Sequence, residues 1–273
     1  MSVITISREL ASLGDEIAKE LEKRLHYRFV DRHSIEERIK SYGISKINFD
    51  KYDERKPSFF ASISQERDDY LHCLKRALLD EAQGGKCIFI GRGVFAVFKG
   101  VTGVLPVFLV SSMNVRIERV RSYFRCDEKR AKQIISQSDN DRAGFHRYFF
   151  ETEWKDPENY SITINTSRLN LHYCVETIAN LADTLFDEQT ERDSSKKLAE
   201  LSLAQSIVNH IRYVRKIGVH FLEASVMGTT ATLFGVANSA PMVDAAAAAA
   251  QEIQPIEKVV TEIQIAQEYS IMP

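Results

Sequence analysis

The chain has 273 residues, of which 44% are hydrophobic and 27% charged, as in a soluble globular protein with one large domain or a large and a small one. The formal net charge of −2 shows no excess of positive charge of the kind that nucleic-acid-binding proteins carry. The chain contains no run of 18 apolar residues, so no membrane span is predicted. Its four cysteines are widely spaced and indicate neither a zinc site nor a disulfide framework.

A strand, a short loop and a helix are predicted at the start of the chain. Residues 3–6 (VITI) are a β-branched run that is typical of a buried strand. Residues 17–25 carry apolar side chains at positions 17, 18, 21 and 25, which lie on one face of a helix. This order is the setting of a phosphate-binding loop, here residues 7–16 (SRELASLGDE). The segment contains no signal-peptide core, so we expect a cytoplasmic protein.

The predicted loop keeps little of the phosphate-binding motif G-x-x-x-x-G-K-[ST]. Gly14 is retained, but Glu9 takes the place of the first glycine. Asp15 replaces the lysine and Glu16 the serine or threonine, and each would repel a phosphate oxygen about 4 Å away by roughly 1–4 kcal/mol. Both are also ordinary residues for a first helical turn, whose N–H groups still favour an anion. Arg8 is the only cation in the first 18 residues, and our hypothesis is that it stands in for the missing lysine.

The chain continues as alternating strands and helices. Strands are predicted at residues 27–31, 87–90, 104–110 and 162–166. Helices are predicted over residues 66–83 and from Ser34, where Glu37 completes a capping-box spacing. Two of the strands, 87–90 and 104–110, are apolar throughout, as expected for strands covered on both faces. The alternation predicts an α/β protein with a doubly wound parallel sheet.

Several segments, taken in order, resemble one family. They are ITISRE and GDEIAKELEKRL within residues 4–25, IGRG at 90–93, VRIER at 115–119, SDNDRA at 138–143 with YF at 148–149, and INTSRL at 164–169. Through them residues 3–185 resemble the cytidylate kinase-like family, relatives of the P-loop nucleoside monophosphate kinases. The resemblance implies a three-layer P-loop kinase fold, a small nucleoside monophosphate region and an arginine-bearing lid. It also implies nucleotide partners, ATP with Mg²⁺, and an ATP-phosphate loop made of Ser12, Gly14, Asp15 and Glu16.

The resemblance also implies residues that bind the acceptor nucleotide. Arg92, between two glycines after a strand, matches a contact to the monophosphate, although a glycine turn with a surface arginine gives the same pattern. Asp139 and Arg142 match a D-x-x-R pair that reads the cytosine edge and the phosphate, or they form a surface ion pair three residues apart. Asp31 resembles an acidic position near the reacting phosphates, and it equally fits the start of a helix.

Lid arginines are implied at Arg116 and Arg119, which match the family's R-x-x-R. In such kinases these arginines close on the transferring phosphoryl group and neutralise its charge. Together with Arg8 they are the candidate catalytic residues. The alternative is a solvated charged helix, because acidic residues are interspersed among the arginines.

A second domain is predicted after a polar segment. Residues 187–197 (DEQTERDSSKK) are nearly free of apolar side chains, as in a linker or a frayed helix end. They separate residues 1–186 from residues 198–273, which carry four basic and seven acidic side chains. The pattern of residues 198–266 predicts an α-β-β-α-β module, with elements at 198–211, 219–227, 229–236, 242–253 and 259–265.

This module resembles a BON domain, through Gly228 and Gly235 around its central hairpin and the segment IEKVVTEI at residues 256–263. The resemblance implies binding rather than catalysis. Its acidic surface argues against attraction to anionic lipid, so a protein partner or a small regulatory ligand is expected.

Two functions therefore remain open. One is an enzyme that moves the γ-phosphoryl group of ATP to a pyrimidine nucleoside monophosphate such as CMP or dCMP. The other is a catalytically inactive pseudo-kinase that senses nucleotides and signals through its BON-like domain. Asp15 and Glu16 favour the second function, whereas Arg92, Asp139 and Arg142 favour a working acceptor site.

Overall fold

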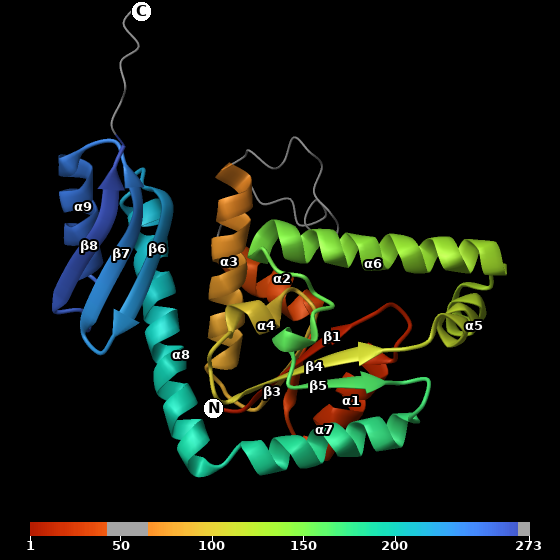
Figure 1. Ribbon diagram of the computed structural model, residues 1–273. Coiled ribbons are helices and arrows are strands. Elements are labelled where there is room, and N and C mark those ends of the chain that lie inside the picture. Colours follow the sequence, from red (N-terminus) through yellow and green to blue (C-terminus); the bar gives the residue numbers. More distant parts are fainter. Residues whose placement is uncertain (43–64, 267–273) are drawn as a thin grey trace, which may run out of the picture. The chain divides into compact units, whose positions relative to one another are not determined.

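The computed structural model describes residues 1–42 and 65–266 of the chain. The chain divides into two compact units, residues 1–195 and residues 196–273 (Figure 1). Within the described residues, no helix combines the length and apolar character that crossing a membrane requires.

A five-stranded parallel sheet forms the centre of the first unit. In the order β2-β3-β1-β4-β5, its strands are Arg28–Val30, Cys87–Ile90, Val3–Arg8, Val104–Val110 and Ile162–Asn165. Strand β1 lies in the middle, where Val3 is opposite Cys87 on one side and Val104 on the other. The α/β fold with a parallel sheet that the sequence predicts is confirmed.

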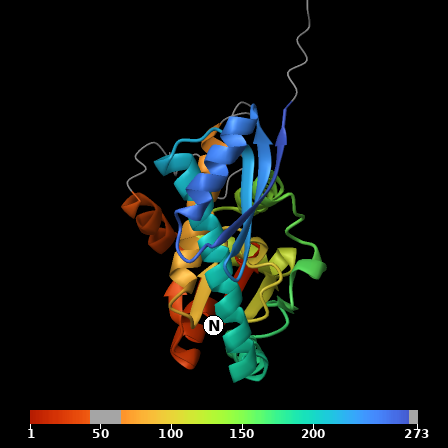
Figure 2. The same cartoon turned by 90° about the vertical axis from the view of Figure 1, so that its left-hand side faces the viewer.

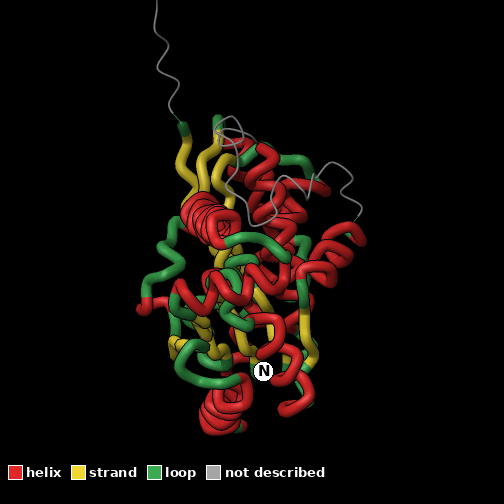
Figure 3. The backbone as a smooth tube through the Cα atoms, turned by 90° about the vertical axis from the view of Figure 1, so that its right-hand side faces the viewer, coloured by secondary structure: helices red, strands yellow, loops and turns green. Residues whose placement is uncertain are grey.

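Helices cover both faces of this sheet, which gives three layers (Figures 1 and 3). They are α1 (Gly14–Leu25), α2 (Arg32–Ser41), α3 (Gln65–Ala82), α4 (Val94–Val97), α5 (Met113–Phe124), α6 (Glu128–Phe150), the 3-10 helix η3 (Pro157–Asn159) and α7 (Leu171–Leu185). Helices α1 and α7 share a core with Ile4 and Ile6 of β1. On the opposite face, Phe89 of β3 packs against Phe98 at the end of α4, with 5.9 Å between ring centroids. Burial on both faces explains the continuous apolar runs of β3 and β4.

Helix α8 (Glu188–Asn209) crosses the division between the units. It includes most of the polar segment 187–197 that composition predicts as a linker or a frayed helix end. In the first unit, Ser194 is fully buried and its hydroxyl donates to the carbonyl oxygen of Met1 at 2.7 Å. Contacts between residues this far apart in sequence hold the first turns of α8, and a local composition pattern does not reveal them.

The second unit contains a three-stranded sheet in the order β6-β7-β8. After the end of α8 come the π-helix η4 (His210–Val214), β6 (His220–Met227), β7 (Thr230–Ala237), α9 (Ala240–Gln251) and β8 (Lys258–Ile265). Strands β6 and β7 form an antiparallel hairpin, and β8 pairs parallel to β7 after the α9 crossover. Helix α9 lies on one face of this sheet (Figure 2), where Ala231, Ala246 and Ala250 are fully buried. The predicted α-β-β-α-β order is confirmed.

The contribution of the α1 contact to the first unit can be measured with Leu21→Ala. Leu21 is fully buried, so we expect the free energy of unfolding to fall by about 2–5 kcal/mol. The matched change Leu185→Ala, at a side chain that is 43% exposed, should cost about 0.5 kcal/mol or less. Urea unfolding followed by the fluorescence of Trp154, the single tryptophan, reports on this unit. Equal losses in the two variants would contradict the described core.

Candidate functional site

The loop after β1, residues 9–13, lies at the carboxyl edge of the sheet. The connection that leaves β1 leads to β2 on one side, whereas the connection that leaves its neighbour β4 leads to β5 on the other. Ligands of open α/β sheets bind where neighbouring connections diverge in this way. The N–H of Glu9 donates to the carbonyl of Leu109 in β4 at 3.0 Å, which ties the loop to this point. The candidate site is therefore the edge between β1 and β4.

Two residues of the loop adopt a conformation that glycine usually takes. Ala11 has φ 62° and Leu13 has φ 64°. The left-handed conformation costs an L-residue roughly 1–2 kcal/mol, and it persists only where surrounding contacts hold it. Contacts with the rest of the first unit must therefore hold this loop in its conformation.

Arg8 and Gly14 lie against each other at the two ends of the loop. A Cβ added to Gly14 would come within 2.8 Å of the Cγ atom of Arg8. The absence of a side chain at Gly14 therefore leaves space for the aliphatic part of Arg8 at the start of α1. The aliphatic part of Arg8, the candidate stand-in for the motif lysine, therefore lies beside the start of α1.

The remaining residues of the predicted ATP-phosphate loop divide into two groups. Ser12 is buried, and its hydroxyl donates to the carbonyl oxygens of Glu9 at 2.8 Å and Leu109 at 3.0 Å. Asp15 and Glu16 are exposed in the first turn of α1. The N-cap of this helix, Leu13, provides no side-chain hydrogen bond to its N–H groups. An anion at this point would meet both the helix N-terminus and two carboxylates.

Arg116 of α5 is a buried residue that contacts the loop. Its side chain is 3% exposed. The guanidinium donates to the carbonyl of Leu10 at 2.8 Å, pairs with Asp139 at 2.6 Å and lies 3.3 Å from a carboxylate oxygen of Glu9. A solvated charged helix, the alternative left open by the sequence, does not describe this residue. We name Glu9, Arg116, Asp139 and Lys155 the loop cluster.

Arg119, about one helical turn after Arg116, also binds the backbone of the loop. It donates to the carbonyl of Ala11 at 2.9 Å and to the carbonyl of Thr166 at 2.9 Å. Burial lowers the pKa of the Arg119 guanidinium, although the negative charge of Glu16 acts in the opposite direction. Arg116 and Arg119, the two arginines that the resemblance assigns to a lid, thus both bind the backbone of the loop.

Asp139 and Lys155 complete the loop cluster. Asp139 accepts the N–H of Leu10 at 3.1 Å, and its carboxylate lies 3.7 Å from the guanidinium of Arg142, three residues later on α6. The ammonium of Lys155 lies 2.6 Å from the carboxylate of Glu9. Sequence reasoning missed Lys155. The nearest signal was its position next to Trp154, the only tryptophan of the chain.

Arg92 belongs to a separate group of contacts at the end of β3. It is 4% exposed, and it donates to the hydroxyl of Tyr70 and to the carboxylate of Glu36, each at 3.2 Å. The flanking Gly93 has φ 68°, and a Cβ there would lie 2.1 Å from the ring of Phe150. The surface arginine considered from the sequence is therefore a buried, paired one.

Asp31 is the N-cap of α2, which is one of the two alternatives that the sequence left open. Its carboxylate accepts the N–H and the hydroxyl of Ser34, each at 2.9 Å. The helix begins at Arg32, so the prediction of a start at Ser34 with a capping box is wrong. Burial opposes ionisation of Asp31, but the hydrogen bonds from Ser34 outweigh it and hold the pKa of this carboxyl below its ordinary value.

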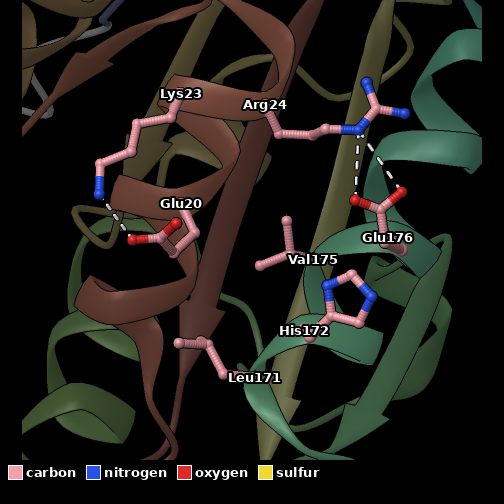
Figure 4. A pocket seen from close by; sticks show the side chains of 7 residues that line it. All are labelled: Glu20, Lys23, Arg24, Leu171, His172, Val175 and Glu176. Atoms are coloured by element: carbon pink, nitrogen blue, oxygen red, sulfur yellow. Dashed lines mark hydrogen bonds and ion pairs between the residues drawn. The ribbon is translucent and has the colours of Figure 1, made fainter.

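A groove between α1 and α7 lies apart from these residues (Figure 4). Leu171 and Val175 form its floor, and the ion pairs Lys23–Glu20 and Arg24–Glu176 lie along its sides. None of the predicted site residues lines it. It is open to solvent and its charges are paired, so it adds nothing to the candidate site.

Comparison with known proteins decides the family. Residues 3–168 match the model of the cytidylate kinase-like family, which covers more than half of the chain. The chain belongs to this family. A search of curated proteins found no match.

Solved structures resemble the first part of this cytidylate kinase-like protein. An uncharacterized protein from Eubacterium ventriosum ATCC 27560 is similar with a TM-score of 0.55 and 18% identity, over 67% of this chain and 99% of its own. Shikimate kinase from Bacteroides thetaiotaomicron gives 0.41 and 16%, over 67% and 98%. Shikimate kinase from Acinetobacter baumannii, in complex with shikimate, gives 0.38 and 15%, over 67% and 94%. At this identity, the first likeness supports the fold alone.

Removal of the central cation tests the loop cluster. Arg116→Met removes the buried cation that contacts both nearly buried carboxylates, those of Glu9 and Asp139, and leaves them only the half-exposed Lys155 and the more distant Arg142. We expect the free energy of unfolding to fall by about 3–5 kcal/mol. Arg121→Met, at an exposed position of the same helix, should change it by about 0.5 kcal/mol or less. Similar values for both variants in urea unfolding would rule out this central position of Arg116.

The N-cap of α2 gives a pH-dependent prediction. Asp31→Ala should lower the free energy of unfolding by about 1 kcal/mol at pH 7. Because the folded protein lowers the pKa of Asp31, its ionised form stabilises the fold above the ordinary pKa near 3.9, and this contribution is lost as pH falls through the folded pKa. The difference between wild type and variant should therefore shrink below about pH 4. Urea unfolding from pH 6 to pH 3 measures it, and a constant difference would contradict the assignment.

Proposed function

We propose that this protein transfers the γ-phosphoryl group of ATP to a pyrimidine nucleoside monophosphate of the CMP or dCMP type. The observation that carries the proposal is the loop after β1, whose backbone Arg116 and Arg119 hold at the carboxyl edge of the central strand. Membership of a kinase-like family supports phosphoryl transfer as the reaction. The match of Asp139 and Arg142 to the family's D-x-x-R supports a pyrimidine acceptor.

On the ATP side, the phosphates lie against the loop at Ser12 and Gly14 and against the first turn of α1. The N–H groups of this turn favour an anion, because no side chain of the N-cap residue occupies them. Arg8, whose aliphatic part lies against Gly14, is the cation of the loop itself. Asp15 and Glu16 oppose binding of the phosphates unless a cation lies between them.

Mg²⁺ is the cation that such kinases use, and it prefers hard oxygen ligands. The exposed carboxylates of Asp15 and Glu16 are donors of this class and would hold it. Among the residues described by the structure, no group of three or more His, Cys, Asp or Glu side chains is arranged to bind a metal. That fits an ion that takes most of its ligands from phosphate and water. When bound, Mg²⁺ neutralises charge on the phosphates.

On the acceptor side, Arg92 binds the monophosphate. Its planar guanidinium suits two phosphate oxygens. A phosphate would replace Glu36 as its anionic partner. Asp31 anchors the start of α2. Asp139 and Arg142, which the resemblance assigns to the base and the phosphate of the acceptor, lie on α6, where Asp139 also binds Arg116 and the N–H of Leu10.

The reaction is an in-line displacement. An oxygen of the acceptor phosphate bonds to the γ-phosphorus as the bond to the β,γ-bridging oxygen breaks, which yields ADP and a nucleoside diphosphate. No covalent intermediate with the protein is needed, so its contribution is positioning and charge neutralisation. Arg8 contacts the transferred group, and Arg116 and Arg119 position the loop through their backbone contacts.

A second candidate function is a catalytically inactive, cytoplasmic pseudo-kinase that senses nucleotides. The observation that favours it is the exposure of Asp15 and Glu16 at the motif's lysine and hydroxyl positions. In both versions, residues 1–186 form the kinase-like domain and residues 198–273 a BON-like binding domain, joined through 187–197. The second domain would bind a protein partner or a small ligand.

Phosphoryl transfer from labelled ATP to a panel of nucleoside monophosphates tests the proposal. We expect transfer to CMP or dCMP. Arg92→Lys keeps the charge but loses the planar fork, so it should raise the KM for CMP about tenfold and leave the KM for ATP unchanged. Arg121→Lys is the matched control, with both values unchanged.

The outcomes separate the two functions. Transfer with an unchanged KM for CMP in Arg92→Lys would remove Arg92 from the acceptor site. No transfer to any acceptor, with a melting temperature raised by CMP alone, would favour the nucleotide sensor, because only a bound ligand stabilises the fold in this way.

A further inference from the structure

The loop after β1 lacks its own lysine, but a lysine from elsewhere in the chain reaches it. Asp15 stands where the phosphate-binding motif has lysine. The ammonium of Lys155, which follows α6, lies 2.6 Å from the carboxylate of Glu9 and 3.9 Å from that of Asp139. Glu9 is itself the residue at the motif's first glycine. A positive charge is thus present at the loop, delivered by a segment 140 residues away from position 15.

The segment that carries Lys155 is fixed by its neighbour. Trp154 is 2% exposed and packs edge-on against Phe108 of β4, with 5.5 Å between ring centroids. Its carbonyl accepts the hydroxyl of Tyr160 at 2.5 Å. The backbone at this point is therefore anchored to the central sheet, and the lysine starts from a defined position beside the loop.

Lys155 differs from Arg116, the other cation of the loop cluster, in its access to solvent. Its side chain is 50% exposed, whereas that of Arg116 is 3% exposed. An ammonium has three N–H donors, and the contact with Glu9 uses one of them. A ligand at the loop can reach this charge without displacing the buried pairs of Arg116.

We propose that Lys155 supplies the cation that the phosphate-binding motif lacks and contacts the phosphate oxygens of ATP. This inference rests on the proposed function, because it assigns a residue to the ATP side of that site. Glu9 orients the ammonium in the free protein and competes with phosphate for it. Loss of the lysine and loss of the Glu9 charge therefore act on ATP affinity in opposite directions.

Calorimetric titration of the full-length protein with ATP and Mg²⁺, and separately with CMP, tests the inference. Lys155→Met should weaken ATP binding about tenfold, the loss typical of a hydrogen bond to a charged group, with CMP binding within about twofold of wild type. Lys23→Met is the matched control, because Lys23 also pairs with one carboxylate, Glu20, but lies at the groove between α1 and α7, apart from the loop cluster (Figure 4). It should leave both affinities unchanged.

Glu9→Gln distinguishes a phosphate contact from a structural ion pair. The amide keeps an acceptor for the N–H of Ser111, which lies 3.3 Å from the carboxylate, but removes the charge that competes for Lys155. We expect ATP to bind about threefold more tightly to this variant, by the reduced repulsion. If the pair were only structural, Glu9→Gln and Lys155→Met would weaken ATP binding alike, and the inference would be overturned.

The double variant Asp15→Lys/Lys155→Met supplies a rescue. A lysine at the motif position should restore ATP affinity to within about threefold of wild type. ATP binding by wild type with an unaltered affinity in Lys155→Met would refute the inference and leave the proposed function standing. A folded wild-type protein that binds no ATP would refute both.

Discussion

The rest of the candidate site depends on the contacts that the buried guanidinium of Arg116 makes. It is almost completely buried, and it contacts Glu9, Asp139 and the carbonyl of Leu10 at once. A charge taken out of water is costly unless several partners compensate it. The loop, α5 and α6 are therefore held in one arrangement, and the left-handed backbone at Ala11 and Leu13 persists within it.

Positive charge reaches this site from several elements of the fold. Arg8 comes from the end of β1, Arg119 from α5 and Lys155 from the segment after α6. The motif positions themselves carry the opposite charge, at Asp15 and Glu16. Residues 7–16 alone carry one basic and three acidic side chains, so most of the positive charge near the loop comes from elements elsewhere in the chain.

The second unit is built on small side chains and a simple alternation. Alanines at 231, 246 and 250 are fully buried, so α9 packs close to its sheet. Its elements could be predicted from their periodicity, because each strand and helix shows its own repeat of apolar residues. The same periodicity does not indicate a ligand, because it shows which face of a strand or helix is buried and not what binds to the exposed face.

The sequence by itself determined the order of the strands, the parallel sheet and the resemblance to the family, because periodicity and short motifs are local properties of the chain. It also placed the candidate loop at residues 7–16. Only the tertiary structure decided that Arg116 is a buried partner of two carboxylates, that Arg92 is paired with Glu36, and that Lys155 lies at the loop. Each of these pairs joins residues that lie between 23 and 146 positions apart. Burial and charge pairing at such separations depend on how the elements pack, which no local pattern encodes.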